Sequence, residues 1–144
     1  MPVKTPLARL SYAKLHTPEQ NANGKDKYSA MLIFEPGTDL SELENGAMEA
    51  AIDLYGSKEK LPNGVKKKSL AKGSGWPFRD GEDQDGKDGH QEGGLYINVS
   101  TYGSAPKVVR KENGIMVKVE EDEIKSGDYV KAMLTPKGFK VDGN

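Results

Sequence analysis

The run Lys27-Tyr28-Ser29-Ala30-Met31-Leu32-Ile33-Phe34 decides the fold class of this chain. Its even-numbered members from Tyr28 to Phe34 share one face of an extended chain, and Met31 and Ile33 lie on the other. Pro36-Gly37 follows directly and ends the extended segment. The run therefore predicts a β-strand with an apolar face on each side.

One helix is predicted immediately after this strand. Asp39 can cap the first free backbone amides, and Glu42 three residues later completes a capping box. Gly56 supplies the stop signal, whereas Gly46 lies mid-helix and costs about 1 kcal/mol relative to alanine. The apolar positions at helical spacing are Leu40, Leu43, Ala47, Ala51 and Leu54. We expect this helix to pack on the core.

Further strand-forming runs lie on both sides of the helix. They are residues 7–12, Leu95–Tyr102, 107–111, 115–119 and 129–134. Asn113-Gly114 separates two alternating runs and predicts a tight hairpin, whereas the polar segment 17–24 contains a proline and is expected to be a loop. Five or six short strands with one helix predict a mainly β fold, a small barrel or sandwich. The OB-fold, a partly open five-stranded barrel that binds oligonucleotides, is the natural candidate.

Composition limits the function classes. The 144 residues suit one domain spanning residues 1–144, with 35% hydrophobic and 30% charged residues and a mean hydropathy of −0.72. The net charge of −1 removes the simple argument that a basic protein binds nucleic acid. The absence of cysteine excludes disulfides, thiolate metal sites and a cysteine nucleophile. Met1-Pro2-Val3-Lys4 is not the start of a signal peptide, so a cytoplasmic location is expected.

Residues 57–94 form a long insertion with almost no apolar periodicity. Residues 58–79 hold seven basic side chains against one acidic one, a net charge of +6, and residues 80–92 hold six acidic side chains against Lys87, a net charge of −5. A structureless connection of this length is uncommon in a compact domain and usually means binding or disorder. We expect a basic and then acidic loop.

The aromatic and basic residues of this insertion are candidates for nucleic-acid binding. Trp76, Phe78 and Arg79 lie in the glycine-rich segment 73–81, where two rings and a cation could stack bases and hold a phosphate. The alternative for Trp76 is an anchor in the core. Four lysines precede the rings and are candidate phosphate contacts, or else a solvated run: Lys66, Lys67, Lys68 and Lys72.

The strand Leu95–Tyr102 supplies a second candidate surface. Leu95, Ile97 and Val99 are expected to face inward. Tyr96 and Tyr102 then face outward, where they could stack bases, with Asn98 and Ser100 between them. The alternative is that both tyrosines pack under a neighbouring loop. Lys107, Arg110 and Lys111 add positive charge in the following hairpin, which is otherwise a solvated face.

Metal binding and catalysis have little support in the sequence. On a calcium-binding loop Asp83, Asp85 and Glu92 would take positions three, five and twelve, but Gly81 stands at position one. The two histidines, His16 and His90, lie on predicted loops without a paired nucleophile. No phosphate-binding loop or dinucleotide fingerprint is present. We therefore expect no catalytic residues, no metal, no cofactor and no enzyme activity.

The ordered set of short motifs resembles a family of phage-encoded single-stranded DNA-binding proteins. The motifs span almost the whole chain: Thr5-Pro6, Arg9-Leu10-Ser11-Tyr12, residues 25–34, Gly37-Thr38-Asp39-Leu40, Pro77-Phe78-Arg79-Asp80-Gly81, Tyr96-Ile97-Asn98-Val99-Ser100, Ile124, Ser126-Gly127 and Tyr129-Val130. The resemblance implies an OB-fold that binds single-stranded DNA with little sequence preference in phage replication or recombination. Expected partners are single-stranded DNA, with replication proteins and further copies of the chain left open.

The resemblance leaves other readings open. Proteins of this family usually continue with a further strand, so the chain is expected to be a short or C-terminally truncated member. Truncation would affect barrel closure, oligomer contacts and partner recruitment. The first rival function is a protein-interaction or structural phage module that docks a partner on residues 57–94. The second is a metal-dependent nuclease using Asp80, Asp83 and Asp85.

Overall fold

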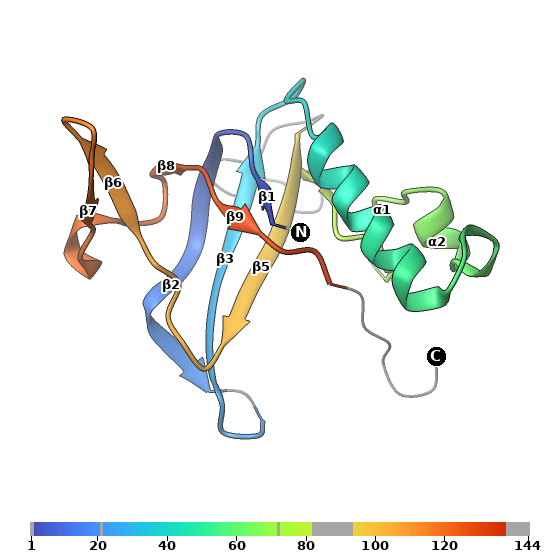
Figure 1. The fold of residues 1–144 in the computed structure, drawn as a ribbon, viewed down its shortest axis with the longest axis horizontal. Helices are drawn as coiled ribbons and strands as arrows, with labels where there is room; N and C mark the ends of the chain where they lie inside the picture. Colours follow the sequence, from blue (N-terminus) through green and yellow to red (C-terminus); the bar gives the residue numbers. More distant parts are fainter. Residues whose placement is uncertain (1, 21, 72, 82–93, 138–144) are drawn as a thin grey trace.

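A computed structural model describes residues 2–20, 22–71, 73–81 and 94–137 and confirms the mainly β prediction (Figure 1). The strands are β1 (Val3–Lys4), β2 (Ala8–Gln20), β3 (Asp26–Phe34), β4 (Arg79–Asp80), β5 (Leu95–Tyr102), β6 (Val109–Glu112), β7 (Ile115–Lys118), β8 (Tyr129–Val130) and β9 (Met133–Leu134). The helices are α1 (Ser41–Tyr55) and the short α2 (Asn63–Lys66), with 3-10 turns at Lys58–Lys60 and Glu121–Glu123.

An antiparallel sheet in the order β4-β5-β3-β2-β8 forms the centre of the molecule. β1 and β9 pair beyond its edge, where the Thr5 amide donates to the Ala132 carbonyl at 2.7 Å. The predicted strand over 129–134 is therefore two strands, because β8 pairs with β2 and β9 with β1. Among the described strands, no ladder closes this sheet into a barrel.

β2 is longer than expected. The predicted loop over 17–24 is wrong in its first half, because the strand continues to Gln20. Pro18 lies at a register shift between Lys14 and Glu19, where the missing backbone donor is tolerated. Hairpin pairing of Glu19 with Lys27 and of Gln20 with Asp26 thus outweighs the loop signal of the sequence.

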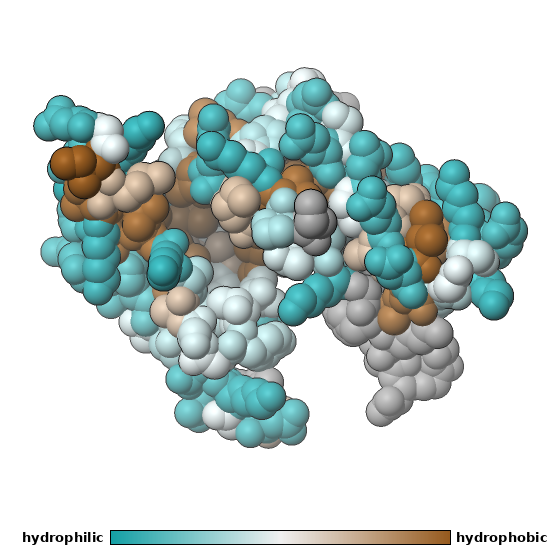
Figure 2. Space-filling model, in the orientation of Figure 1, coloured by the Kyte–Doolittle hydropathy of each residue, from teal (hydrophilic) through white to brown (hydrophobic). Residues whose placement is uncertain are grey.

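The Asn-Gly hairpin is confirmed. Asn113 and Gly114 have φ angles of 49° and 81°, as a tight two-residue turn between β6 and β7 requires. This hairpin lies at one end of the molecule, and α1 and α2 lie at the other (Figure 1). Ile115 and Met116 are exposed on it, and apolar atoms are visible there in Figure 2.

The predicted helix is confirmed with small changes at its ends. It begins at Ser41, whose amide donates to Asp39 Oδ1 at 3.0 Å, and no capping-box contact from Glu42 forms at this end. Hydrogen bonds from the Ser41 hydroxyl and amide lower the pKa of Asp39. Gly56 ends the helix in the left-handed conformation. Leu54 was expected in the core, but Ile52 and Tyr55 pack there instead.

The described part of residues 57–94 is folded, which corrects the expectation of a structureless loop. Its buried apolar side chains, Leu61, Val65, Trp76 and Phe78, join the main core. Gly64 allows the α2 backbone to approach Ser74 so closely that an added Cβ would lie 2.9 Å from the Ser74 Cα. Residues 82–93, and with them most of the acidic run, lie outside the described residues.

Candidate nucleic-acid interface

The register of the central sheet separates two faces. The inner face carries core residues such as Leu10, Leu32 and Ile97, which lie directly opposite one another on β2, β3 and β5. The odd-numbered residues of β3 point to the opposite side, which we call the outer face. Residues directly opposite in an antiparallel ladder share a face, so the pairing defines which side chains meet there.

One row of residues crosses all five strands on the outer face. Its Cα partners are, in strand order, Arg79, Tyr96, Ile33, Arg9 and Tyr129. Tyr96 and Ile33 are buried in its centre, whereas the two arginines are half-buried and Tyr129 is 55% exposed. The arginines are separated by three strand spacings, about 14 Å. The row therefore places two cations and one ring around an apolar centre.

The next rows on this face are polar. Asn98 and Ser11 flank Met31, and Ser100 lies opposite Ser29. The strand ends then bring Tyr102, which is 51% exposed, opposite Lys27. Hydroxyl and amide groups thus fill the space between exposed rings, an arrangement suited to hydrogen bonding and stacking of bases without a fixed sequence.

Trp76 and Phe78 do not lie on this surface. The expectation that both rings ride exposed on a loop is wrong, because they are 4% and 2% exposed. Their ring centroids are 5.8 Å apart, with a tilt of 40°, and both belong to the main core. The alternative reading of Trp76 as a core anchor holds. Phe78 inserts into the core directly before β4, and Arg79 is then paired beside Tyr96.

The two tyrosines of β5 have different surroundings. The alternation predicted for this strand is confirmed, since Leu95, Ile97 and Val99 pack on the main core. Tyr96 faces the other way, as expected, but is only 3% exposed and is buried with Met31 and Ile33. A flat base cannot stack on a ring so enclosed, whereas Tyr102 presents its ring to solvent.

The predicted lysine and arginine contacts are spread over the molecule. Lys66, Lys67 and Lys68 lie in or after α2, and Lys68 approaches Glu44 at 3.5 Å. Lys107 and Arg110 lie near or in the β6–β7 hairpin at the opposite end (Figure 1). The structure therefore does not bring these two groups together. Lys72 lies outside the described residues.

Arg110 is already neutralised within the chain. Its Nε donates to Glu112 at 2.7 Å and its Nη1 donates to Glu123 at 2.5 Å. These carboxylates raise the pKa of Arg110, the Glu123 hydrogen bond contributing most. The pKa of Glu123 is lowered by the Glu120 amide and by Arg110. The guanidinium thus joins β6 to the 3-10 turn Glu121–Glu123, which follows β7.

The residues proposed for metal or nuclease chemistry fall mostly outside the described part of the chain. Asp80 is on β4, but Asp83, Asp85 and Glu92 are not described. His16, predicted on a loop, lies on β2 with its Nε2 3.0 Å from the Val119 carbonyl oxygen. Within the described residues, no cluster of three or more histidine or carboxylate groups could hold a metal. No described helix is long and apolar enough to cross a membrane.

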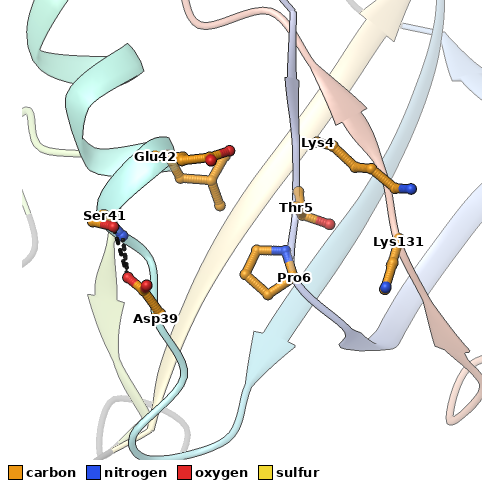
Figure 3. Close-up of a pocket in the computed structure, with 8 residues that line it drawn as sticks. Lys4, Thr5, Pro6, Asp39, Ser41, Glu42 and Lys131 are labelled. Carbon is orange, nitrogen blue, oxygen red and sulfur yellow. Dashed lines mark hydrogen bonds between the residues drawn. The ribbon is translucent and has the colours of Figure 1, made fainter.

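A cleft of about 350 Å³ lies between the start of α1, the end of β1 with the residues that follow it, and Lys131 between β8 and β9 (Figure 3). Lys4 and Lys131 line it together with Asp39 and Glu42, and Asp39 is bonded to Ser41. Positive and negative side chains are equal in number here. The cleft therefore offers no surface of one sign for a polyanion.

Sequence reasoning missed three residues of the outer face. They are Arg9, Lys27 and Tyr129. Arg9 alternates with the buried Ala8 and Leu10, so the strand pattern contained the signal. Its place beside Tyr129 depends on pairing with a strand more than one hundred positions away, which no local pattern gives.

Comparison with known proteins identifies the family of the chain. The family model described as the single-stranded DNA-binding protein of Enterobacter phage Enc34 matches residues 1–144. The chain belongs to this family. The resemblance stated from the sequence is therefore confirmed. No curated protein matches the sequence.

Solved structures of the phage Enc34 protein have the same fold. Its complex with single-stranded DNA has a TM-score of 0.67 at 18% identity, and covers 98% of this chain and 77% of that chain. A C-terminal truncation of the same protein has a TM-score of 0.68 at 19% identity, and covers 98% of this chain and 76% of that chain. A further structure of the phage Enc34 protein has a TM-score of 0.66 at 19% identity, and covers 98% of this chain and 72% of that chain. The expected mainly β architecture is shared with a fold that holds single-stranded DNA in one of these structures.

Proposed function

We propose that this protein binds single-stranded DNA, without catalysis and with little sequence preference, on the outer face of the β4-β5-β3-β2-β8 sheet. The observation that carries the proposal is the row in which Arg79 and Arg9 flank a buried apolar centre. Membership in the Enc34 family supports the ligand class. In an infected cell such a protein would act in the cytoplasm during phage replication or recombination.

The chemistry of the proposed contact follows from the exposed groups. Arg9 and Arg79 hold the backbone, since guanidinium groups match phosphate oxygens with two parallel hydrogen bonds. Tyr129 and Tyr102 lie at the two sides of the face and are exposed by about half, so each can stack one base. Stacking contributes about 1–3 kcal/mol per base and tolerates any sequence, because every base has a π-face.

Of the contacts expected from the sequence, some remain in this proposal and some do not. Arg79 and Tyr102 remain as direct contacts. Lys66, Lys67 and Lys107 have no ion pair with another described residue, but they lie outside the face and are not assigned direct phosphate contacts. The buried rings of the 76–78 segment and of Tyr96 serve to hold the face in shape.

A titration tests the function. A fluorescent oligothymidylate is mixed with the protein at several salt concentrations, and its anisotropy is followed with unlabelled single strand or duplex as competitor. We expect binding that weakens with salt, since released counterions drive association, and a single strand that competes better than duplex. No binding at low salt would contradict the proposal and favour the protein-docking alternative. Magnesium-dependent degradation of the oligonucleotide would favour the nuclease.

A further inference from the structure

The outer edge of β5 is open along most of its length. β4 pairs only with Leu95 and Tyr96, at the start of the strand. From Ile97 to Tyr102, no described strand lies on the side away from β3, and Figure 1 shows the lower half of β5 at the margin of the sheet. Among the described residues, the sheet therefore ends in a six-residue stretch of strand edge with no paired strand.

The backbone groups that face outward can be identified from the ladder. The Gly103 amide donates to the Asp26 carbonyl at 2.9 Å, so Gly103 directs its hydrogen bonds toward β3. Hydrogen-bonding direction alternates along an antiparallel strand. Asn98, Ser100 and Tyr102 therefore direct their amide and carbonyl groups away from β3. All three residues are exposed, and none of their backbone groups has a partner among the described residues.

The composition of this edge lacks the usual protection. Natural sheet edges are protected by lysine, proline, bulges or covering loops, because an unpaired edge is a template for another strand. Residues 97–102 read Ile-Asn-Val-Ser-Thr-Tyr, without a charge, a proline or a glycine. The pairing of β5 with β3 also runs without a bulge. The segment is uncharged, and three of its six residues are β-branched, which is the pattern of a strand that pairs.

We propose that this edge pairs with the same edge of a second copy of the chain, antiparallel about a two-fold axis at Ser100. Ser100 then lies opposite Ser100 of the second copy, and Asn98 lies opposite Tyr102 of the second copy. This register satisfies the amide and carbonyl of all three outward-facing residues in each chain. A segment that carries no charge meets no repulsion from its own copy.

The surrounding structure fits this register. Beyond Tyr102 the chain leaves the strand at Gly103, whose φ of 86° favours glycine. The second copy thus turns away before it reaches the position opposite Tyr96, which β4 already occupies. Pairing joins two five-stranded sheets into one and places the two outer faces side by side. A DNA strand could then run from one copy to the next, but the pairing itself does not depend on DNA.

Sedimentation of the protein without DNA tests the pairing. Wild type is expected to pass from a mass of 15.7 kDa to twice this value as its concentration rises. Ser100→Lys places two ammonium groups opposite each other and is expected to weaken the dimer by about tenfold or more. Ser100→Thr keeps an uncharged side chain and should behave as wild type. A wild type that stays monomeric at every concentration, or an unchanged dimer in Ser100→Lys, would overturn the proposal.

A disulfide test fixes the register and does not require the lysine variant to fold. The chain has no cysteine, so Ser100→Cys introduces a single thiol. Residues opposite each other in a hydrogen-bonded pair have Cα atoms about 5.5 Å apart, within the range that a disulfide spans. Mild oxidation is expected to link the two copies of Ser100→Cys, whereas Glu49→Cys, exposed on α1, should remain unlinked. Equal linking of both variants would contradict the register. Since DNA is absent, this result is separate from the outcome of the DNA titration.

Discussion

Replacing Phe78 by alanine should destabilise the fold far more than it weakens the DNA contact. The ring is 2% exposed and packs at 5.8 Å from the Trp76 ring. Removal of a buried phenylalanine side chain costs about 3–5 kcal/mol, a large share of the roughly 5–15 kcal/mol that holds a domain folded. With a urea dependence of about 2 kcal/mol per molar, the unfolding midpoint should fall by roughly 2 M. Trp76 fluorescence reports the transition, because the indole leaves the core on unfolding.

The matched control for this prediction is Tyr129→Ala on the outer face. This ring is 55% exposed, so its loss should change the unfolding free energy by less than about 0.5 kcal/mol. It should weaken oligothymidylate binding by about 1–3 kcal/mol if the ring stacks a base. The reasoning is refuted if Phe78→Ala leaves the urea midpoint unchanged and lowers the affinity of the folded protein by that amount.

Two further predictions concern stability. Gly64→Ala puts a Cβ against the Ser74 backbone and should lower the unfolding free energy by about 1–3 kcal/mol, although alanine favours a helix; a urea midpoint equal to or above that of wild type would show that the two segments can move apart. The Asp39 carboxylate has a folded pKa below its ordinary 3.8, mainly because the Ser41 hydroxyl donates to it. Its contribution is therefore present above pH 3.8 and is lost as the pH falls through the lowered folded pKa. Wild type should lose more thermal stability than Asp39→Asn on acidification through that range, and equal losses would count against this role.

The alternation along β5 could be predicted from the sequence, but the exposure of its outer side could not. Tyr96 and Tyr102 both point away from the main core, as the period of two requires. Only Tyr102 is exposed, because Tyr96 is covered together with Met31 and Ile33. A face that is outer with respect to the main core can still have its own apolar centre. The period of a strand predicts to which side of the sheet a side chain points, but it does not predict whether other residues cover that side.

The 57–81 segment shows a different limit. Leu61, Val65, Trp76 and Phe78 are all buried. The first two are spaced as in a helix and the last two as in a strand, so the four together follow no single period. Their burial depends on an irregular path with a close backbone approach at Gly64. Periodicity therefore predicts a loop for this segment and exposed positions for its rings. The apolar residues themselves were the signal, since four large side chains in a short stretch rarely remain in solvent.

The pairing that builds the outer face lies beyond any local pattern. Arg9 and Arg79 are seventy positions apart in the sequence and reach one row only through β3 and β5. Tyr129 joins them because β8 returns to the start of β2. The cations that are prominent in the sequence lie instead in or after α2 (Lys66 to Lys68) and on β6 (Arg110), at opposite ends of the molecule (Figure 1). Charge density along the chain did not locate the row of cations on the sheet.

The salt dependence of DNA binding tests the central claim most directly. For single strands the slope of log K against log salt changes by about 0.7 for each phosphate contact. The double variant Arg9→Ala with Arg79→Ala should therefore lower the slope by about 1.4, and Lys66→Ala with Lys67→Ala, which removes the same charge away from the face, should lower it much less. An unchanged slope in the arginine variant, with a reduced slope in the lysine variant, would contradict the outer face as the DNA-binding surface.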